Sequence, residues 1–212
     1  MVDMTPGRGA YGESGSPAES DNSLVRAAWQ AGNNGIPELR AADLAQINGC
    51  DGAGVSPLAA AAMAGHPEAV EALLDGNADP NLVCGELRPL QAVFFPLLFV
   101  TAEKAQAGGA DIEIVPPPQA PGVEYGSDPD REHRAEIVER LLASGADPNF
   151  SADDFGYPLR LALLSGEARL VEALMNYGAD PALPKHLSTS ARLSGNGHLL
   201  PLLRRRVTRG AR

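Results

Sequence analysis

Gly145-Ala146-Asp147-Pro148-Asn149 is the stretch of sequence that decides the fold, because close copies of it occur twice more in the chain. Asn77-Ala78-Asp79-Pro80-Asn81 precedes it, and Gly178-Ala179-Asp180-Pro181 follows it 33 residues later. Self-similarity at a period of this size is typical of repeat proteins, in which each unit packs on its neighbours.

A short amphipathic helix is expected before each copy. Its apolar residues are spaced i, i+3 and i+4, which places them on one side of a helix. A Glu follows the first apolar residue each time and lies on the opposite face. The apolar sets are Val70, Leu73, Leu74, then Val138, Leu141, Leu142, then Val171, Leu174, Met175, and the acidic residues are Glu71, Glu139 and Glu172. Gly145, Gly178 and Asn77 suit the left-handed turn that ends such helices.

A second helix is expected upstream in each unit, beginning at a proline. The starts are Ser56-Pro57-Leu58-Ala59, Arg88-Pro89-Leu90-Gln91 and Tyr157-Pro158-Leu159-Arg160. Proline in the first helical turn loses no hydrogen bond and presets φ. The first and third of these helices are expected to end at Gly65 and Gly166.

These motifs together resemble the ankyrin repeat, most completely over Asp51–Asn81. The resemblance implies an all-α solenoid of helix-turn-helix repeats with hairpin loops, whose function is to bind another protein. Ala59, Gln91 and Arg160 stand where the family usually has His, so the sequence leaves open whether the hydrogen bonds of that His between repeats are formed.

The expected organisation is one repeat domain between two tails. A tail rich in Gly, Ser and Pro, expected to be disordered, covers 1–22, and a basic tail covers 204–212. The domain, 23–203, divides into about five repeats, of which the first and last are degenerate caps: 23–48, 49–81, 82–149, 150–181 and 182–203.

The middle repeat is interrupted. Pro89 and Pro148 are 59 residues apart where Pro57 and Pro80 are 23 apart, so 36 residues are inserted, at about 97–132. We expect an extended first helix to about 107, a short strand at 111–115, and a second helix starting near Glu132. The insertion is interpreted in two ways: it binds the partner, or it packs back on the repeats and covers Phe94, Phe95 and Phe99. Both interpretations remain open together.

The net charge of −10 disfavours nucleic acid and anionic membranes as ligands and favours a partner with a basic surface. Acidity that only maintains solubility is the alternative. Arg outnumbers Lys 15 to 2, which suggests a GC-rich bacterial genome. Cys50 and Cys84 lack Cys-x-x-Cys spacing and are interpreted as ordinary small residues of a cytoplasmic protein. No signal peptide or membrane span is expected.

No catalytic residue, cofactor or metal site is expected. His66 is interpreted as structural, and His133, His186 and His198 have no second ligand at zinc spacing. Asp153 and Asp154 lie at an expected hairpin tip, where solvation disfavours acid–base chemistry. The hypothesis from another functional class is an enzyme whose active site is completed by the insertion.

The function expected from the resemblance is that of a monomeric adaptor or inhibitor, one version being an immunity protein that neutralises a basic toxin or enzyme. An effector directed at a host is a further hypothesis. Partner contacts are expected from the hairpin tips and the exposed ends of the first helices: Gly52, Ala53, Val55, Met63, Ala64, Gly85, Leu87, Phe95, Asp153, Asp154, Gly156, Leu164 and Ser165.

Overall fold

The computed structural model describes residues 17, 20–31, 39, 46–85, 87–96, 127–151 and 156–204. Within these ranges the chain is helical and has no β-strand, which confirms the predicted all-α fold. An isolated antiparallel bridge joins Cys84 to Leu87. The helices are α1 (Ser23–Trp29), α3 (Pro57–Ala64), α4 (Pro67–Asp75), α5 (Pro89–Ala92), α7 (Asp128–Ala143), α8 (Pro158–Ser165), α9 (Ala168–Asn176), α10 (Leu187–Leu193) and the 3-10 helix η4 (Gly197–Arg204).

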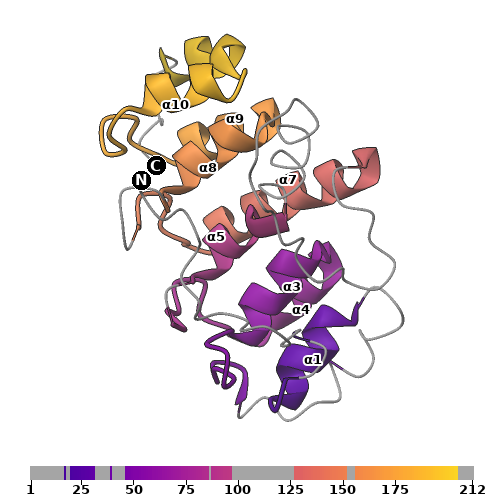
Figure 1. Ribbon diagram of the computed structural model, residues 1–212. Coiled ribbons are helices and arrows are strands. Elements are labelled where there is room, and N and C mark those ends of the chain that lie inside the picture. The colour runs from indigo at the N-terminus through magenta and orange to yellow at the C-terminus, as the bar shows by residue number, and fades with distance from the viewer. Residues whose placement is uncertain are drawn as a thin grey trace, which may run out of the picture.

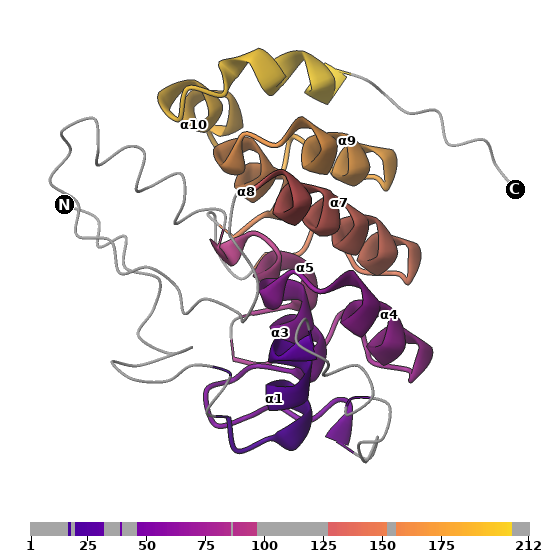
Figure 2. The same ribbon diagram turned by 90° about the vertical axis from the view of Figure 1, so that its right-hand side faces the viewer.

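The helices stack in chain order from α1 at one end to α10 and η4 at the other (Figure 1). They form two layers: α4, α7 and α9 lie along one side of the stack, and α3, α5 and α8 lie along the other (Figure 2). In one layer, α3 packs against its neighbours α1 and α5, and it also packs against α4 of the other layer. In that other layer, α7 packs against α4 and α9. An apolar core of described residues runs through the stack between the layers.

The first helices begin as the sequence predicts, with Pro57, Pro89 and Pro158 in the first turn. Ser56 caps α3, because its Oγ accepts the Ala59 N–H at 3.1 Å. Every residue of α3 is buried, and five of its eight residues are alanine. These small side chains allow α1 and α5 to approach α3 closely from both sides, which explains a core with few aromatic residues.

The helices end through the left-handed turns that the sequence predicts. φ is +80° at Gly65 and +79° at Gly166, after the first helices. After the second helices it is +69° at Asn77, +95° at Gly145 and +90° at Gly178. Asn is the residue that best tolerates this conformation after Gly, so the three turns are built alike.

The second helix of the interrupted repeat is longer than the sequence predicts. It begins at Asp128 rather than near Glu132, and has 16 residues where α4 and α9 have nine each. Ser127 caps it by accepting the Asp130 N–H at 3.3 Å. Residues 97–126, with the expected helix to 107 and the expected strand, lie outside the described residues. Residues 128–132 of the insertion therefore form the start of α7, about one and a half turns.

The two cysteines form a disulfide, so their interpretation as ordinary small residues is wrong. The Cα atoms of Cys50 and Cys84 are 5.7 Å apart, and the bond joins loops 34 residues apart in the sequence. The sequence did not indicate this because the two residues become neighbours only when successive repeats stack.

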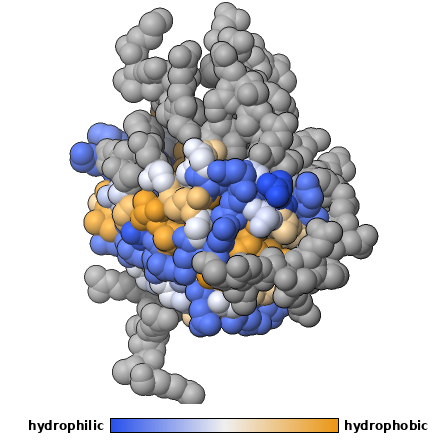
Figure 3. All heavy atoms as spheres, turned by 90° about the horizontal axis from the view of Figure 1, so that it is seen from below, coloured by the Kyte–Doolittle hydropathy of each residue, from blue (hydrophilic) through white to orange (hydrophobic). Residues whose placement is uncertain are grey.

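The two ends of the stack differ in construction. At one end Asn22 caps α1, and its Oδ1 accepts the Leu24 N–H at 2.9 Å. Hydrophobic residues are visible between hydrophilic ones when the molecule is viewed from this end (Figure 3). At the other end the second helix is a 3-10 helix with Pro201 inside it. Proline lacks the N–H that a continuing α-helix requires.

No helix in the described ranges is long and apolar enough to cross a membrane.

Candidate protein-binding surface

Asp51 organises the loop at 51–55, the first of the predicted hairpin tips. Its Oδ1 accepts the N–H groups of Ala53 at 3.0 Å and Val55 at 2.8 Å. Its Oδ2 accepts the hydroxyl of Ser20, in the segment before α1, at 2.7 Å. One buried carboxylate thus shapes the loop and attaches it to the preceding unit, which leaves the loop backbone little freedom.

A ladder of asparagine side chains links successive turns along one edge of the stack. Asn48 Oδ1 accepts the N–H of Asp79 at 2.8 Å, and Asn149 Oδ1 accepts the N–H of Asp180 at 2.7 Å. Between them, Asn81 Oδ1 accepts the N–H of Asp147 at 2.8 Å. Each turn is therefore positioned by the turn before it.

Gln91 and Arg160 make hydrogen bonds between repeats at the positions where the ankyrin family usually has His. Gln91 Nε2 donates to the carbonyl oxygen of Gly156 at 2.8 Å. Arg160 Nη2 donates to the carbonyl oxygen of Lys185. Both bonds run from a first helix to the next loop, so the question that the sequence left open is answered for these two positions. The apolar Ala59 has no such donor.

A buried ion pair anchors the extended part of α7 in the stack. Arg134 Nε lies 2.8 Å from Asp130 Oδ1, and the two side chains are 0% and 2% exposed. Arg134 also donates to the carbonyl oxygens of Val93 at 2.9 Å and Met63 at 3.3 Å. The guanidinium thus satisfies carbonyls at the ends of α3 and α5, where a helix favours a positive charge.

His66 lies beside this ion pair and is buried. Burial lowers its pKa below the usual value of a histidine, and the positive charge of Arg134 lowers it further; a hydrogen bond with the Trp29 backbone and the charge of Glu68 oppose the shift. Its position, at the N-cap of α4, is that of a structural residue. Within the described part of the chain, no group of three or more His, Cys, Asp or Glu residues is arranged to hold a metal.

The predicted contact residues differ in accessibility. Gly52 and Gly85 are exposed, and a further group is half-buried: Ala53, Leu87, Phe95, Gly156, Leu164 and Ser165. Val55, Met63 and Ala64 are at most 1% exposed and belong to the core. Their side chains offer no surface to a partner, because the stacking of neighbouring units covers them. Asp153 and Asp154 lie outside the described residues.

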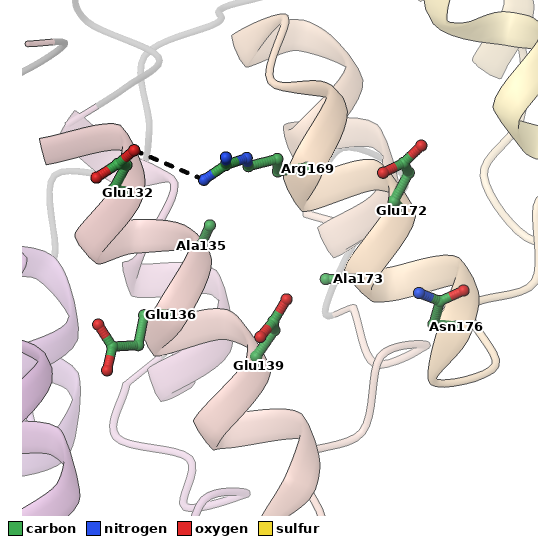
Figure 4. A pocket seen from close by; sticks show the side chains of 8 residues that line it. All are labelled: Glu132, Ala135, Glu136, Glu139, Arg169, Glu172, Ala173 and Asn176. Atoms are coloured by element: carbon green, nitrogen blue, oxygen red, sulfur yellow. Dashed lines mark ion pairs between the residues drawn. The ribbon is translucent and has the colours of Figure 1, made fainter. Parts of the chain in front are cut away.

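An acidic groove between α7 and α9 is a feature that the sequence-based list of contacts omits. It has a volume of about 310 Å³ and is lined by Glu132, Ala135, Glu136, Glu139, Arg169, Glu172, Ala173 and Asn176. Ala135 of α7 and Ala173 of α9 lie between the two helices, and Glu132 and Arg169 point toward one another, whereas Glu136 points away from α9 (Figure 4). Four carboxylates and one guanidinium line it, so its charge is negative.

Ion pairs link α7 to the helices on both of its sides, α4 and α9. Arg140 Nη1 lies 2.8 Å from Glu71 of α4, and its Nη2 lies 2.7 Å from Glu136. The hydrogen bonds that Arg140 donates to Glu136, the larger cause, and to Glu71 raise its pKa. Across the groove, Arg169 lies 3.9 Å from Glu132. The sequence carried a signal for this surface in the Glu that follows each apolar Val, but not the fact that α7 and α9 place these residues together.

A comparison with protein-family models matches residues 53–84 to the ankyrin repeat. The matched segment contains α3, α4 and the loop to Cys84, where the helix pair and its left-handed turns have just been described. A comparison with curated proteins found no match. Ankyrin repeats generally mediate protein–protein interaction and are typically not catalytic. The chain therefore contains an ankyrin repeat at residues 53–84.

Proposed function

We propose that the chain is a non-catalytic module that binds a partner protein through its concave face, its hairpin tips and the insertion in its middle repeat. The observation that carries the proposal is the set of side-chain links from one unit to the next, exemplified by Gln91 to Gly156. A surface fixed in advance loses little conformational entropy on binding, which is what a recognition module requires.

The accessible members of the predicted contact set define the proposed loop surface. They are Gly52, Ala53, Gly85, Leu87, Phe95, Gly156, Leu164 and Ser165. We leave out Val55, Met63 and Ala64 because they are buried. Asp153 and Asp154 stay in the proposal as the acidic tip of the next loop. We also keep as proposals the division into five repeats, the two tails and the monomeric state.

A basic surface on the partner is supported by the charge of this chain. The net charge is −10, and the groove between α7 and α9 adds a local concentration of carboxylates. Acidic surfaces accelerate the approach of basic proteins and select against acidic ones. An inhibitor or immunity protein that neutralises a basic toxin or enzyme is the specific form of this proposal, and a bacterial origin fits it.

The state of the two cysteines bears on the compartment. A cytoplasmic location is the expectation from the sequence, but thiols in a reducing cytosol are kept from forming stable disulfides. The Cys50–Cys84 bond therefore favours an oxidising compartment. Alkylation of the protein at the moment of lysis, followed by non-reducing mass spectrometry, distinguishes the two locations.

The partner is best sought with the full chain and three variants. Purification from the native organism should recover one partner with the wild type and lose it with Ala53→Arg/Leu164→Arg, which places charge on the loop surface. Glu139→Arg/Glu172→Arg should weaken the same partner and reduce the dependence of its affinity on salt. Arg192→Glu changes charge at the exposed end of α10 and is the control.

The proposal fails if the two loop substitutions leave the partner bound with wild-type affinity. Binding that does not change with salt concentration would refute the basic-partner part alone. Removal of 97–126, compared with the full chain, tells whether the insertion contributes to binding. A hydrolytic or transfer activity lost on substitution of the histidines would favour the enzyme hypothesis instead.

A further inference from the structure

The loop at 51–55 and the loop at 84–87 approach each other closely at the backbones of Gly54 and Gly85. A Cβ placed on Gly54 would be 3.3 Å from both the nitrogen and the Cα of Gly85. Both glycines have positive φ, +77° and +60°. The two loop tips, which belong to successive units, therefore touch where neither has a side chain that could hold the other.

Each loop is well ordered internally. Asp51 organises the first, and in the second the N–H of Leu87 donates to the carbonyl oxygen of Cys84 at 3.1 Å. Within the described part of the chain, no hydrogen bond joins residues 51–55 to residues 84–87. What connects them covalently is the bond between Cys50, directly before the first loop, and Cys84, at the start of the second.

The neighbouring interfaces are held differently. Gln91 of α5 reaches the carbonyl of Gly156, and Arg160 of α8 reaches the carbonyl of Lys185. The equivalent residue of α3 is Ala59, which is fully buried and has no polar atom in its side chain. The disulfide therefore occurs at the interface where the first helix, α3, has no side-chain donor that could reach the next loop, at 84–87.

We propose that the Cys50–Cys84 disulfide takes the place of the missing side-chain link, so that the loops at 51–55 and 84–87 are held together only in the oxidised protein. The inference goes beyond the proposed function and does not depend on the identity of the partner. As a consequence, reduction of the disulfide loosens the contact between these two loops. The interfaces held by Gln91 and Arg160 do not change on reduction.

The reaction is thiol–disulfide exchange with a dithiol reductant. Cys50 is exposed and Cys84 is 1% exposed, so a thiolate of the dithiol attacks the sulfur of Cys50. The S–S bond breaks, a mixed disulfide forms at Cys50, and the Cys84 thiolate leaves and takes up a proton. The second thiol of the dithiol then displaces Cys50. The protein gains two electrons and two protons, and the dithiol becomes a cyclic disulfide.

Hydrogen exchange of the full chain, with and without dithiothreitol, tests the proposal. On reduction we expect the amides of Gly54, Val55 and Leu87, which are hydrogen-bonded within their loops, to exchange about tenfold faster. The amide of Asn149, which is bonded to Asp147 at 2.9 Å in the turn further along, should not change. Cys50→Ser/Cys84→Ser should match the reduced wild type under both conditions.

Gln91→Ala is the reciprocal control, because it removes the link at the next interface. It also removes the Oε1 that accepts the Arg88 N–H next to the loop at 84–87, so the loop at 51–55 is the readout. Compared with wild type under the same condition, Gln91→Ala should speed exchange around Tyr157 and leave Gly54 and Val55 unchanged. Unchanged exchange at Gly54 and Leu87 in reduced wild type overturns the proposal, as does the finding of two free thiols in protein incubated with oxidised glutathione. The wild-type comparison stands even if the double serine variant does not fold.

Discussion

The side chain of Asn81 holds the backbone of Asp147, although 66 residues separate them in the sequence. Its Oδ1 accepts the Asp147 N–H at 2.8 Å, and its Nδ2 donates to the carbonyl oxygen of Gly145 at 2.8 Å. Asn149 repeats the arrangement towards Asp180 with no insertion between them. The inserted residues therefore leave the register between successive units unchanged.

Replacing Asn81 with Ala should lower the free energy of unfolding by roughly 1–2 kcal/mol, because two hydrogen bonds between units are lost at a partly exposed site. Urea denaturation followed by circular dichroism measures the change. Asn176→Ala is the control, since the side chain of this exposed asparagine makes no hydrogen bond among the described residues and should cost less than 0.5 kcal/mol, about the limit for surface substitutions. Equal effects of the two substitutions would show that the ladder contributes nothing.

Gly65→Ala should destabilise the protein more than Gly145→Ala. Both residues have positive φ, +80° and +95°, so each substitution costs about 1–2 kcal/mol of backbone strain. At Gly145 a Cβ would meet nothing within 4 Å, whereas at Gly65 it would lie 3.2 Å from both Arg134 Nη2 and Asp130 Oδ1. The additional cost, about 1 kcal/mol or more, arises because a buried ion pair must shift. Thermal unfolding of the two variants measures the difference. A smaller loss of stability in Gly65→Ala than in Gly145→Ala would contradict this packing.

Arg134→Met should cost about 3–5 kcal/mol, because it leaves the Asp130 carboxylate buried without its cation. Arg134→Met/Asp130→Leu removes both charges and should cost less than the single change. The two single variants and the double variant form a cycle whose coupling energy is read from urea denaturation. Additive effects would mean that the two side chains do not stabilise each other.

The stability of the protein should fall as the pH is lowered from 7.5 to 5.5. Burial lowers the pKa of His66 in the folded state, while in the unfolded chain a histidine titrates near its usual pKa of about 6.5. The unfolded state therefore binds the proton first, and the stabilisation present above this pH is lost as the pH falls through it, at up to about 1.4 kcal/mol per pH unit. His66→Gln should reduce this slope.

His198→Gln is the control for that series, because His198 lies on the exposed face of η4. Denaturation midpoints at half-unit pH intervals give the slopes of the three proteins. The same slope in wild type and His66→Gln would exclude His66 as the origin of the pH dependence.

Local patterns in the sequence determined the helices and their ends. Pro57, Pro89 and Pro158 start the first helices, and Gly145, Gly178 and Asn77 take the left-handed conformation, because proline fixes φ and only Gly or Asn readily adopts positive φ. The all-α fold and the ankyrin repeat followed from these positions and their spacing. Such features depend on residues a few positions apart, and a single sequence is enough to show them.

Contacts between units were decided only by the tertiary structure. The disulfide of Cys50 with Cys84, the hydrogen bonds that Arg134 donates to the carbonyl oxygens of Val93 and Met63, and the groove between α7 and α9 each join residues that become neighbours when helix pairs stack. Burial of Met63, which the sequence offered as a surface anchor, has the same cause. The period of the repeat specifies that units stack, but which side chains meet depends on the distance and rotation between units, and no local pattern encodes these.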